Sequence, residues 1–142
     1  MAKILMIDDD IESIEDIRNI LNSNHDVEIA DNIDDAIAQL SKNAYDLLFL
    51  DLYMPHSKRY AAEEAKLGRE TGYLLLKEVR SASSGFQTKN NVPVIVLTFI
   101  RLNMDPALKE KVMKEEPVQI LEKPESLIEI LQCVKLMLMK PN

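Results

Sequence analysis

The chain has 142 residues, which is enough for one domain with a sizeable core and too few for two such domains. With 46% hydrophobic and 29% charged residues, it is expected to be soluble and globular rather than disordered or membrane-spanning. The formal net charge of −7 disfavours a domain whose main task is to grip nucleic acid phosphates.

The chain carries one cysteine, Cys133, so no internal disulfide and no zinc site of several thiolates can form. The amino-terminal apolar stretch turns acidic at Asp8, before the hydrophobic region of a signal peptide could be complete. We therefore expect a cytoplasmic protein with no membrane segment, and a fold that depends on packing alone.

The first predicted element is a short buried strand from Ala2 to Ile7, because this apolar run stops abruptly at three consecutive aspartates. Apolar residues then recur at helical spacing from Ile11, which predicts a helix with acidic residues in its first turn. A brief strand at 27–30 and a second helix from Ile33 follow, with Asp31 or Asn32 available as the helix cap.

The remaining elements continue this alternation of buried strand and amphipathic helix. A continuous apolar run ends at Asp51, and a run rich in valine and isoleucine ends at Thr98; both are typical of central strands. The expected elements are strands at 47–50, 92–97 and 118–121, and helices at 72–79, 104–113 and 126–140.

Strands that alternate with helices in this way predict a doubly wound α/β fold, with a five-stranded parallel sheet covered on both faces. In such folds the functional site lies beyond the carboxyl ends of the strands. The residues found there are Asp8, Asp9, Asp51, Thr98 and Lys123.

Carboxylates that converge on a small pocket repel one another unless a cation lies among them. Mg²⁺, or Mn²⁺ in its place, is the expected occupant, because it binds few carboxylates and retains water or phosphate oxygens. Asp51 is then suited to act as a nucleophile toward phosphorus, with Lys123 and Thr98 stabilising the charge on the phosphoryl oxygens. Taken alone, an acidic cluster such as that at 8–10 is often only a solvated helix start.

These residues, in this order, resemble the receiver domains of two-component response regulators. Asp8 and Asp9 match the acidic pair after the first strand, and Asp51, in Asp-Leu-Tyr-Met-Pro, matches the phosphoacceptor. Thr98 matches the hydroxyl residue, and Lys123 with Pro124 matches the Lys-Pro signature. The resemblance implies a single receiver domain over residues 1–142, with the flavodoxin-like strand order 2-1-3-4-5.

The resemblance also implies a mechanism and partners. Mg²⁺ would be bound by Asp9, Asp51 and the carbonyl of Tyr53, with Asp8 acting through water, and the peptide before Pro124 would be cis. Asp51 would accept a phosphoryl group from a sensor histidine kinase or a histidine phosphotransfer protein and signal by binding a downstream protein. Such a domain is not an enzyme beyond weak self-phosphorylation from small donors and self-dephosphorylation, and it contacts no nucleic acid or membrane.

The chain departs from the family pattern at three places. Residues 56–71 form an insertion of partly helical composition, which we expect to belong to a docking surface or a lid over Asp51. Ile120 stands where an aromatic switch residue is common, so that switch is weakened or replaced. Phe99 stands where a small residue is usual, and its bulk is expected to narrow access to the phosphoryl group.

The last helix is apolar nearly all round, with a predicted core stripe of Leu127, Leu131, Val134 and Leu138. Two interpretations remain open: a well-buried helix with a loose end, or a homodimer or partner interface on the fourth helix, fifth strand and fifth helix. The two histidines, His25 and His56, are expected on exposed loops.

Two other functions compete with phosphoryl acceptance. One is a receiver-like interaction module that acts without phosphorylation, which Ile120 and Phe99 favour. The other is a phosphohydrolase of the haloacid dehalogenase type, but that family needs a second acid two residues after the nucleophile, where this chain has Tyr53. A nucleotide-binding loop is disfavoured because no glycine lies in the turn after the first strand.

Overall fold

The computed structural model describes residues 1–55, 59–60, 70–99, 106–123 and 126–139, without the side chain of Phe99. In this part of the chain, strands and helices alternate as the sequence predicts. The elements are β1 (Lys3–Ile7), α1 (Ile11–Leu21), β2 (Asp26–Ala30), α2 (Ile33–Lys42), β3 (Leu47–Leu50), α3 (Thr71–Arg80), β4 (Val94–Phe99), α4 (Pro106–Met113), β5 (Val118–Lys123) and α5 (Leu127–Met139).

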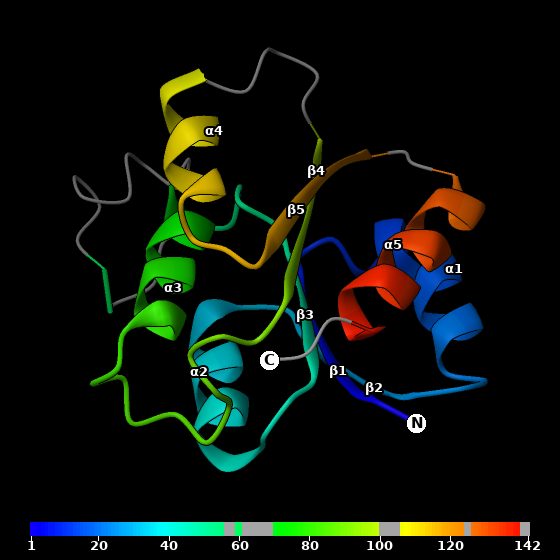
Figure 1. Ribbon diagram of the computed structural model, residues 1–142, viewed down its shortest axis with the longest axis horizontal. Coiled ribbons are helices and arrows are strands. Elements are labelled where there is room, and N and C mark those ends of the chain that lie inside the picture. Colours follow the sequence, from blue (N-terminus) through cyan, green and yellow to red (C-terminus); the bar gives the residue numbers. More distant parts are fainter. Residues whose placement is uncertain (56–58, 61–69, 100–105, 124–125, 140–142) are drawn as a thin grey trace.

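The five strands form one sheet in the order β2-β1-β3-β4-β5, and every neighbouring pair is parallel (Figure 1). This confirms the predicted doubly wound topology. Because all strands run in one direction, their carboxyl ends lie at one edge of the sheet. Asp8 after β1, Asp51 after β3, Thr98 within β4 and Lys123 at the end of β5 therefore share a common surface.

Helices cover both faces of the sheet: α1 and α5 lie on one side, and α2, α3 and α4 lie on the other (Figure 1). Successive side chains of the central strands point to opposite faces, so each strand contributes to two cores. In β3, Leu48 and Leu50 belong to the core under α2, α3 and α4, whereas Leu47 and Phe49 belong to the core under α1 and α5. A strand buried on both faces must be apolar throughout, which explains the uninterrupted run that ends at Asp51.

Side chains at the first turns fix where α1 and α2 begin. The carboxylate of Asp10 accepts the backbone N–H of Ser13 at the start of α1. At the start of α2, Asn32 Oδ1 accepts the backbone N–H of Asp35 at 2.8 Å. Asn32 is therefore the cap of the second helix, one of the two residues that the sequence offered.

Helix α5 faces the sheet with a different stripe from the one predicted. Its buried residues are Ile130, Val134 and Met137, whereas Leu127, Leu131 and Leu138 pack only partly against the core. The prediction was right for Val134 and wrong for the three leucines, because a helix that is apolar nearly all round has little amphipathic asymmetry to fix its rotation. Contact with β3 and α1 selects the buried face instead.

The insertion predicted at 56–71 lies largely outside the described residues, which include only Arg59, Tyr60, Glu70 and Thr71 of it. Arg59 forms an ion pair with Glu78 of α3, and the hydroxyl of buried Tyr60 donates to Glu78 Oε1 at 2.7 Å. Arg59 and Tyr60 of the insertion are thus attached to α3 near its carboxyl end.

Candidate functional site

Asp51 is the first residue after β3 and lies at the centre of the carboxyl edge of the sheet. Its backbone N–H donates to the carbonyl of Ile7 at 3.0 Å, which extends the pairing of β3 with β1 by one residue. The side chain is buried, with 6% of the residue exposed. This position gives the carboxylate a fixed base and limited contact with solvent.

The two oxygens of Asp51 have different surroundings. Oδ1 accepts the hydroxyl of Thr98 at 2.8 Å and the backbone N–H of Tyr53 at 3.1 Å. Oδ2 has no hydrogen-bond donor among the described residues, and its nearest cation, Lys123 Nζ, lies 3.8 Å away. One oxygen is thus held by two donors, whereas the other faces the Lys123 ammonium.

Lys123, the last residue of β5, lies between the acids although it is 115 residues from Asp8 in sequence. Its Nζ donates to Asp8 Oδ2 at 2.6 Å, and both side chains are buried. Asp8 is fixed in turn, because its Oδ1 accepts the backbone N–H of Asp10 at 2.9 Å. The sequence therefore predicted correctly that Asp8, Asp51, Thr98 and Lys123 come together.

Asp8, Asp9 and Asp51 each place one carboxylate oxygen within 4.8 Å of the other two. Asp9 is exposed, whereas Asp8 and Asp51 are buried, so the cluster opens to solvent on one side. Oxygen ligands from a few carboxylates, with open positions for water, are the donor set that Mg²⁺ prefers. These residues fit the predicted metal.

Burial raises the pKa of the Asp8 carboxyl to about 6, with the hydrogen bond from Lys123 opposing the shift and the charge of Asp51 adding to it. Burial also raises the pKa of Asp51, against the opposing effects of Lys123 and Thr98. Two acids with raised pKa values beside a single ammonium form a site with an excess of negative charge, which a divalent cation would compensate.

The structure describes only some of the other predicted site residues. Ile120 is half-buried and packs against the core under α3 and α4. Phe99 pairs with Lys123 in the register of β4 and β5. The side chain of Phe99, Pro124 and its preceding peptide, and His56 lie outside the described residues, so the predictions made for them stay predictions.

Ser13 is a site residue that the sequence analysis missed. Ser13 lies in the first turn of α1, and its Oγ accepts a hydrogen bond from Lys123 Nζ at 2.9 Å. One feature of the sequence could have pointed to it: Ser13 lies three residues after Asp10, in the first helical turn. Side chains in that turn point back toward the amino end of the helix, where the acids lie. A single serine among exposed first-turn residues gave no reason to select it.

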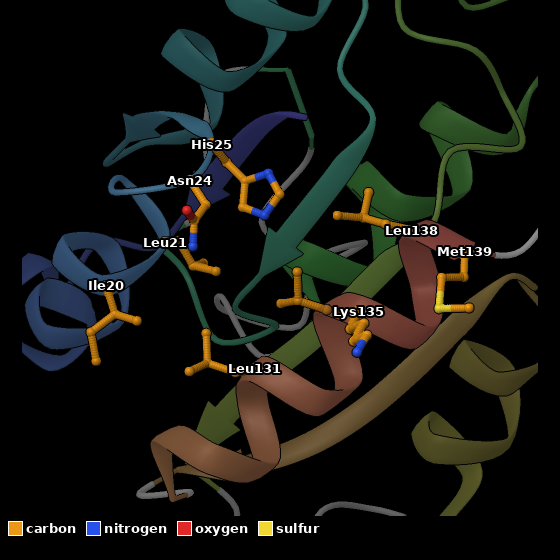
Figure 2. Close-up of a pocket in the computed structure, with 9 residues that line it drawn as sticks. Ile20, Leu21, Asn24, His25, Leu131, Lys135, Leu138 and Met139 are labelled. Atoms are coloured by element: carbon orange, nitrogen blue, oxygen red, sulfur yellow. The ribbon is translucent and has the colours of Figure 1, made fainter. Parts of the chain in front are cut away.

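A separate pocket of about 420 Å³ lies away from the acids, between the carboxyl end of α1 and helix α5 (Figure 2). Its walls are mostly apolar, and His25 and Lys135 are among the residues that line it. His25 was expected to be exposed, but it is half-buried and its Nδ1 accepts the backbone N–H of Ala2 at 3.0 Å. This bond attaches the end of α1 to the start of β1.

The chain belongs to the response regulator receiver domain family, whose model matches residues 4–135. It is 35% identical over 99 residues to a transcriptional regulatory protein CpxR homolog of Haemophilus influenzae. That match covers 69% of this chain and 34% of the relative, so the chain spans about a third of the relative's length.

Solved structures share the fold at lower identity. The receiver domain of Francisella response regulator 1452 has a TM-score of 0.73 at 24% identity, with 97% of each chain covered. Chemotaxis protein CheY4 of Vibrio cholerae has a TM-score of 0.73 at 23% identity, with 96% of this chain and 98% of that chain covered. A two-component response regulator of Clostridium difficile has a TM-score of 0.74 at 22% identity, with 99% and 98% covered.

Proposed function

We propose that this receiver domain accepts a phosphoryl group on Asp51 in a Mg²⁺-dependent reaction with a phosphohistidine of a sensor kinase or phosphotransfer protein. The observation that carries the proposal is the asymmetry of Asp51. Thr98 and the Tyr53 backbone hold Oδ1, while Oδ2 faces the Lys123 ammonium at 3.8 Å. This arrangement leaves one oxygen as the nucleophile and keeps charge-stabilising donors beside it.

In the proposed reaction, Asp51 Oδ2 forms a bond to phosphorus while the bond from phosphorus to the histidine nitrogen breaks. The bonding electrons go to the imidazole, which takes up a proton and leaves as neutral histidine. Lys123 and Thr98 would donate to phosphoryl oxygens. Asp8, Asp9, Asp51 and the Tyr53 carbonyl are the candidate holders of Mg²⁺, which would supply charge compensation on the phosphoryl oxygens.

We infer that the domain is not an enzyme in the sense of turning over a separate substrate. It would at most take phosphoryl groups slowly from small donors and release them by self-dephosphorylation. Output would come from altered binding of a downstream protein in the cytoplasm. Within the described residues, none of the helices is both long and apolar enough to cross a membrane.

A homodimer through α4, β5 and α5 is part of this proposal. Leu136 on α5 is 62% exposed, and Met113 on α4 is 40% exposed, so large apolar side chains on both helices reach solvent. Sedimentation before and after phosphorylation tests it: a concentration-dependent dimer that Leu136→Glu abolishes supports the interface, and a monomer at all concentrations refutes it.

The first test is incubation with Mg²⁺ and acetyl phosphate, followed by measurement of the intact mass. A gain of one phosphoryl group that requires Mg²⁺ and is lost in Asp51→Asn supports the proposal. Failure with acetyl phosphate and with a cognate kinase would favour the alternative, a receiver-like module that binds its partner without phosphorylation. Ile120, which replaces an aromatic residue at the switch position, is the feature that favours this alternative.

A further inference from the structure

The ammonium of Lys123 is held from two sides, by an acid and by a hydroxyl. Lys123 Nζ donates a hydrogen bond to Asp8 Oδ2 at 2.6 Å and another to Ser13 Oγ at 2.9 Å, whereas Asp51 Oδ2 lies 3.8 Å from it. The acid follows β1, and the serine lies in the first turn of α1. Lys123 therefore connects the end of β5 with the end of β1 and the first turn of α1, across β3 and β4.

The orientation of the Ser13 hydroxyl is set by its local structure. A hydroxyl has one proton, and that of Ser13 is donated to the backbone carbonyl of Asp10 at 2.8 Å. Asp10 is fixed as the cap of α1, because its side chain accepts the Ser13 backbone N–H. Toward Lys123 the serine can only accept, so the helix cap provides a fixed, directed acceptor for the ammonium.

We propose that Ser13 is a positioning residue for Lys123 in the phosphoryl-acceptor site, an inference that rests on the proposed function. With Asp8, it holds the ammonium beside Asp51, close enough to stabilise charge that develops on a phosphoryl oxygen. Without the hydroxyl, the ammonium loses one of its two described hydrogen-bond acceptors, and the lysine occupies a wider range of positions. Stabilisation of the charge on a transferring phosphoryl group depends on hydrogen-bond donors that are already in position. The greater mobility of the Lys123 ammonium should therefore slow phosphoryl transfer to Asp51.

Ser23 provides a matched control within the same part of the chain. Its hydroxyl donates to the carbonyl of Ile20, three residues earlier, at 2.7 Å, which repeats the local bond between Ser13 and Asp10. Ser23 lies at the opposite end of α1 from the acids. Ser13→Ala and Ser23→Ala therefore remove equivalent local hydrogen bonds, and only Ser13→Ala removes a contact to Lys123.

The test measures the rate of Asp51 phosphorylation by acetyl phosphate with Mg²⁺ and combines Ser13→Ala with Lys123→Met in a double-mutant cycle. We expect Ser13→Ala to slow phosphorylation by about 3- to 10-fold, the effect of one weakened charge-assisted hydrogen bond. Ser13→Thr, which keeps the hydroxyl, and Ser23→Ala should stay within about twofold of the unmodified protein. In the Lys123→Met background, Ser13→Ala should have no further effect.

A second measurement does not depend on phosphorylation. Proton exchange of the Lys123 ammonium, followed by NMR, should be faster in Ser13→Ala than in the unmodified protein and unchanged in Ser23→Ala. The inference is overturned if Ser13→Ala slows phosphorylation equally in the Lys123→Met background, or if the ammonium exchanges at the same rate without the hydroxyl. If the unmodified protein is never phosphorylated, the proposed function fails, and the exchange rate alone decides whether Ser13 positions Lys123.

Discussion

Gly72 lies directly against the backbone of Asp51. A methyl group on the Gly72 Cα would come within 2.4 Å of the Asp51 carbonyl oxygen and 2.6 Å of the Leu52 Cα. The Gly72 N–H also donates to the carbonyl of Leu52 at 3.1 Å. The first turn of α3 is therefore in backbone contact with the segment that carries the candidate phosphoacceptor.

This contact predicts that Gly72→Ala is strongly destabilising. The atoms that the new methyl group would meet belong to the backbone and cannot turn aside, so α3 or the end of β3 must shift. We expect a loss of about 2–4 kcal/mol in the free energy of unfolding, measured by urea denaturation, together with slower phosphorylation of Asp51. Gly85→Ala is a poor control because Gly85 has a positive φ of 78°, so Ala82→Gly in an exposed turn serves instead.

A small effect of Gly72→Ala on both stability and phosphorylation would contradict this prediction. It would mean that α3 can move away from Asp51 without disturbing the site. The dependence of the unfolding free energy on urea concentration distinguishes a local movement of α3 from a general loosening of the native state. This dependence scales with the surface area that becomes exposed on unfolding.

The fold and the main site residues were predictable because short, local sequence patterns identify them. Each central strand is an apolar run that stops at a polar residue, and in a parallel sheet those ends must share one edge. Asp8, Asp51, Thr98 and Lys123 could thus be brought together without coordinates.

Features that depend on rotation or on backbone partners were not predictable. The rotation of α5 was predicted incorrectly, because Leu131 and Ile130 are equally apolar and only tertiary packing distinguishes them. Ser13 was missed because it lies in the first turn of α1 rather than at the end of a strand, so no pattern in the sequence pointed its hydroxyl toward Lys123. Arg80 was also missed, because its acceptors are backbone carbonyls, which no side-chain pattern reveals.

Arg80, the last residue of α3, ties together the connections at the amino edge of the sheet. Its guanidinium donates to the carbonyls of Asn90 and Val92 before β4, and to those of Glu115 and Pro117 before β5, at 2.6–2.9 Å. Burial lowers the pKa of this guanidinium to about 10, with the nearby Glu115 opposing the shift. The half-buried guanidinium thus joins the segment before β4 to the segment before β5.

We expect Arg80→Met to cost about 2–4 kcal/mol in the free energy of unfolding, since it removes several charge-assisted hydrogen bonds to backbone carbonyls. Urea denaturation checks this. The matched control is Arg18→Met, because Arg18 forms an exposed ion pair with Glu15 at 3.6 Å, and its loss should cost less than about 1 kcal/mol. Equal losses in the two variants would show that the carbonyl contacts of Arg80 contribute little.

The raised pKa of Asp8 predicts how Mg²⁺ binding depends on pH. In the folded protein without metal, burial raises this pKa from its ordinary value of 3.8 to about 6, so the folded state binds more protons than the unfolded state between these values. The contribution of Asp8 to stability therefore falls as the pH rises from about 4 to about 6. Ionised Asp8 above that range costs on the order of 2–3 kcal/mol unless a cation compensates it.

Stabilisation by Mg²⁺ should accordingly grow as the pH rises from 5 to 7, because Asp8 and Asp51 lose their protons and become ligands. The measurement is the shift in melting temperature caused by Mg²⁺ at each pH, with sodium chloride of equal ionic strength as the control for screening. A shift that is the same at pH 5 and pH 7, or larger at pH 5, would rule out these carboxylates as the ligands.

The described end of the 56–71 segment is attached to α3 through Glu78. Arg59 Nε donates to Glu78 Oε1 at 2.8 Å, and the Tyr60 hydroxyl donates to the same oxygen at 2.7 Å. The Arg59 hydrogen bond, with a smaller effect from Tyr60, lowers the pKa of Glu78. Glu78 should therefore remain ionised, and its loss would leave the hydroxyl of buried Tyr60 without this acceptor.

We expect Glu78→Ala to lower the free energy of unfolding by about 1–3 kcal/mol and Tyr60→Phe to lower it by about 0.5–1.5 kcal/mol. The double variant should cost less than the sum, because both changes remove the same hydrogen bond. Glu110→Ala, an exposed acid on α4, is the control. If the segment is a docking surface or lid whose position depends on this attachment, Glu78→Ala should also change the phosphorylation rate, as should deletion of residues 57–69. Strictly additive losses in stability would mean that Tyr60 and Glu78 act independently and that the segment is held by other contacts.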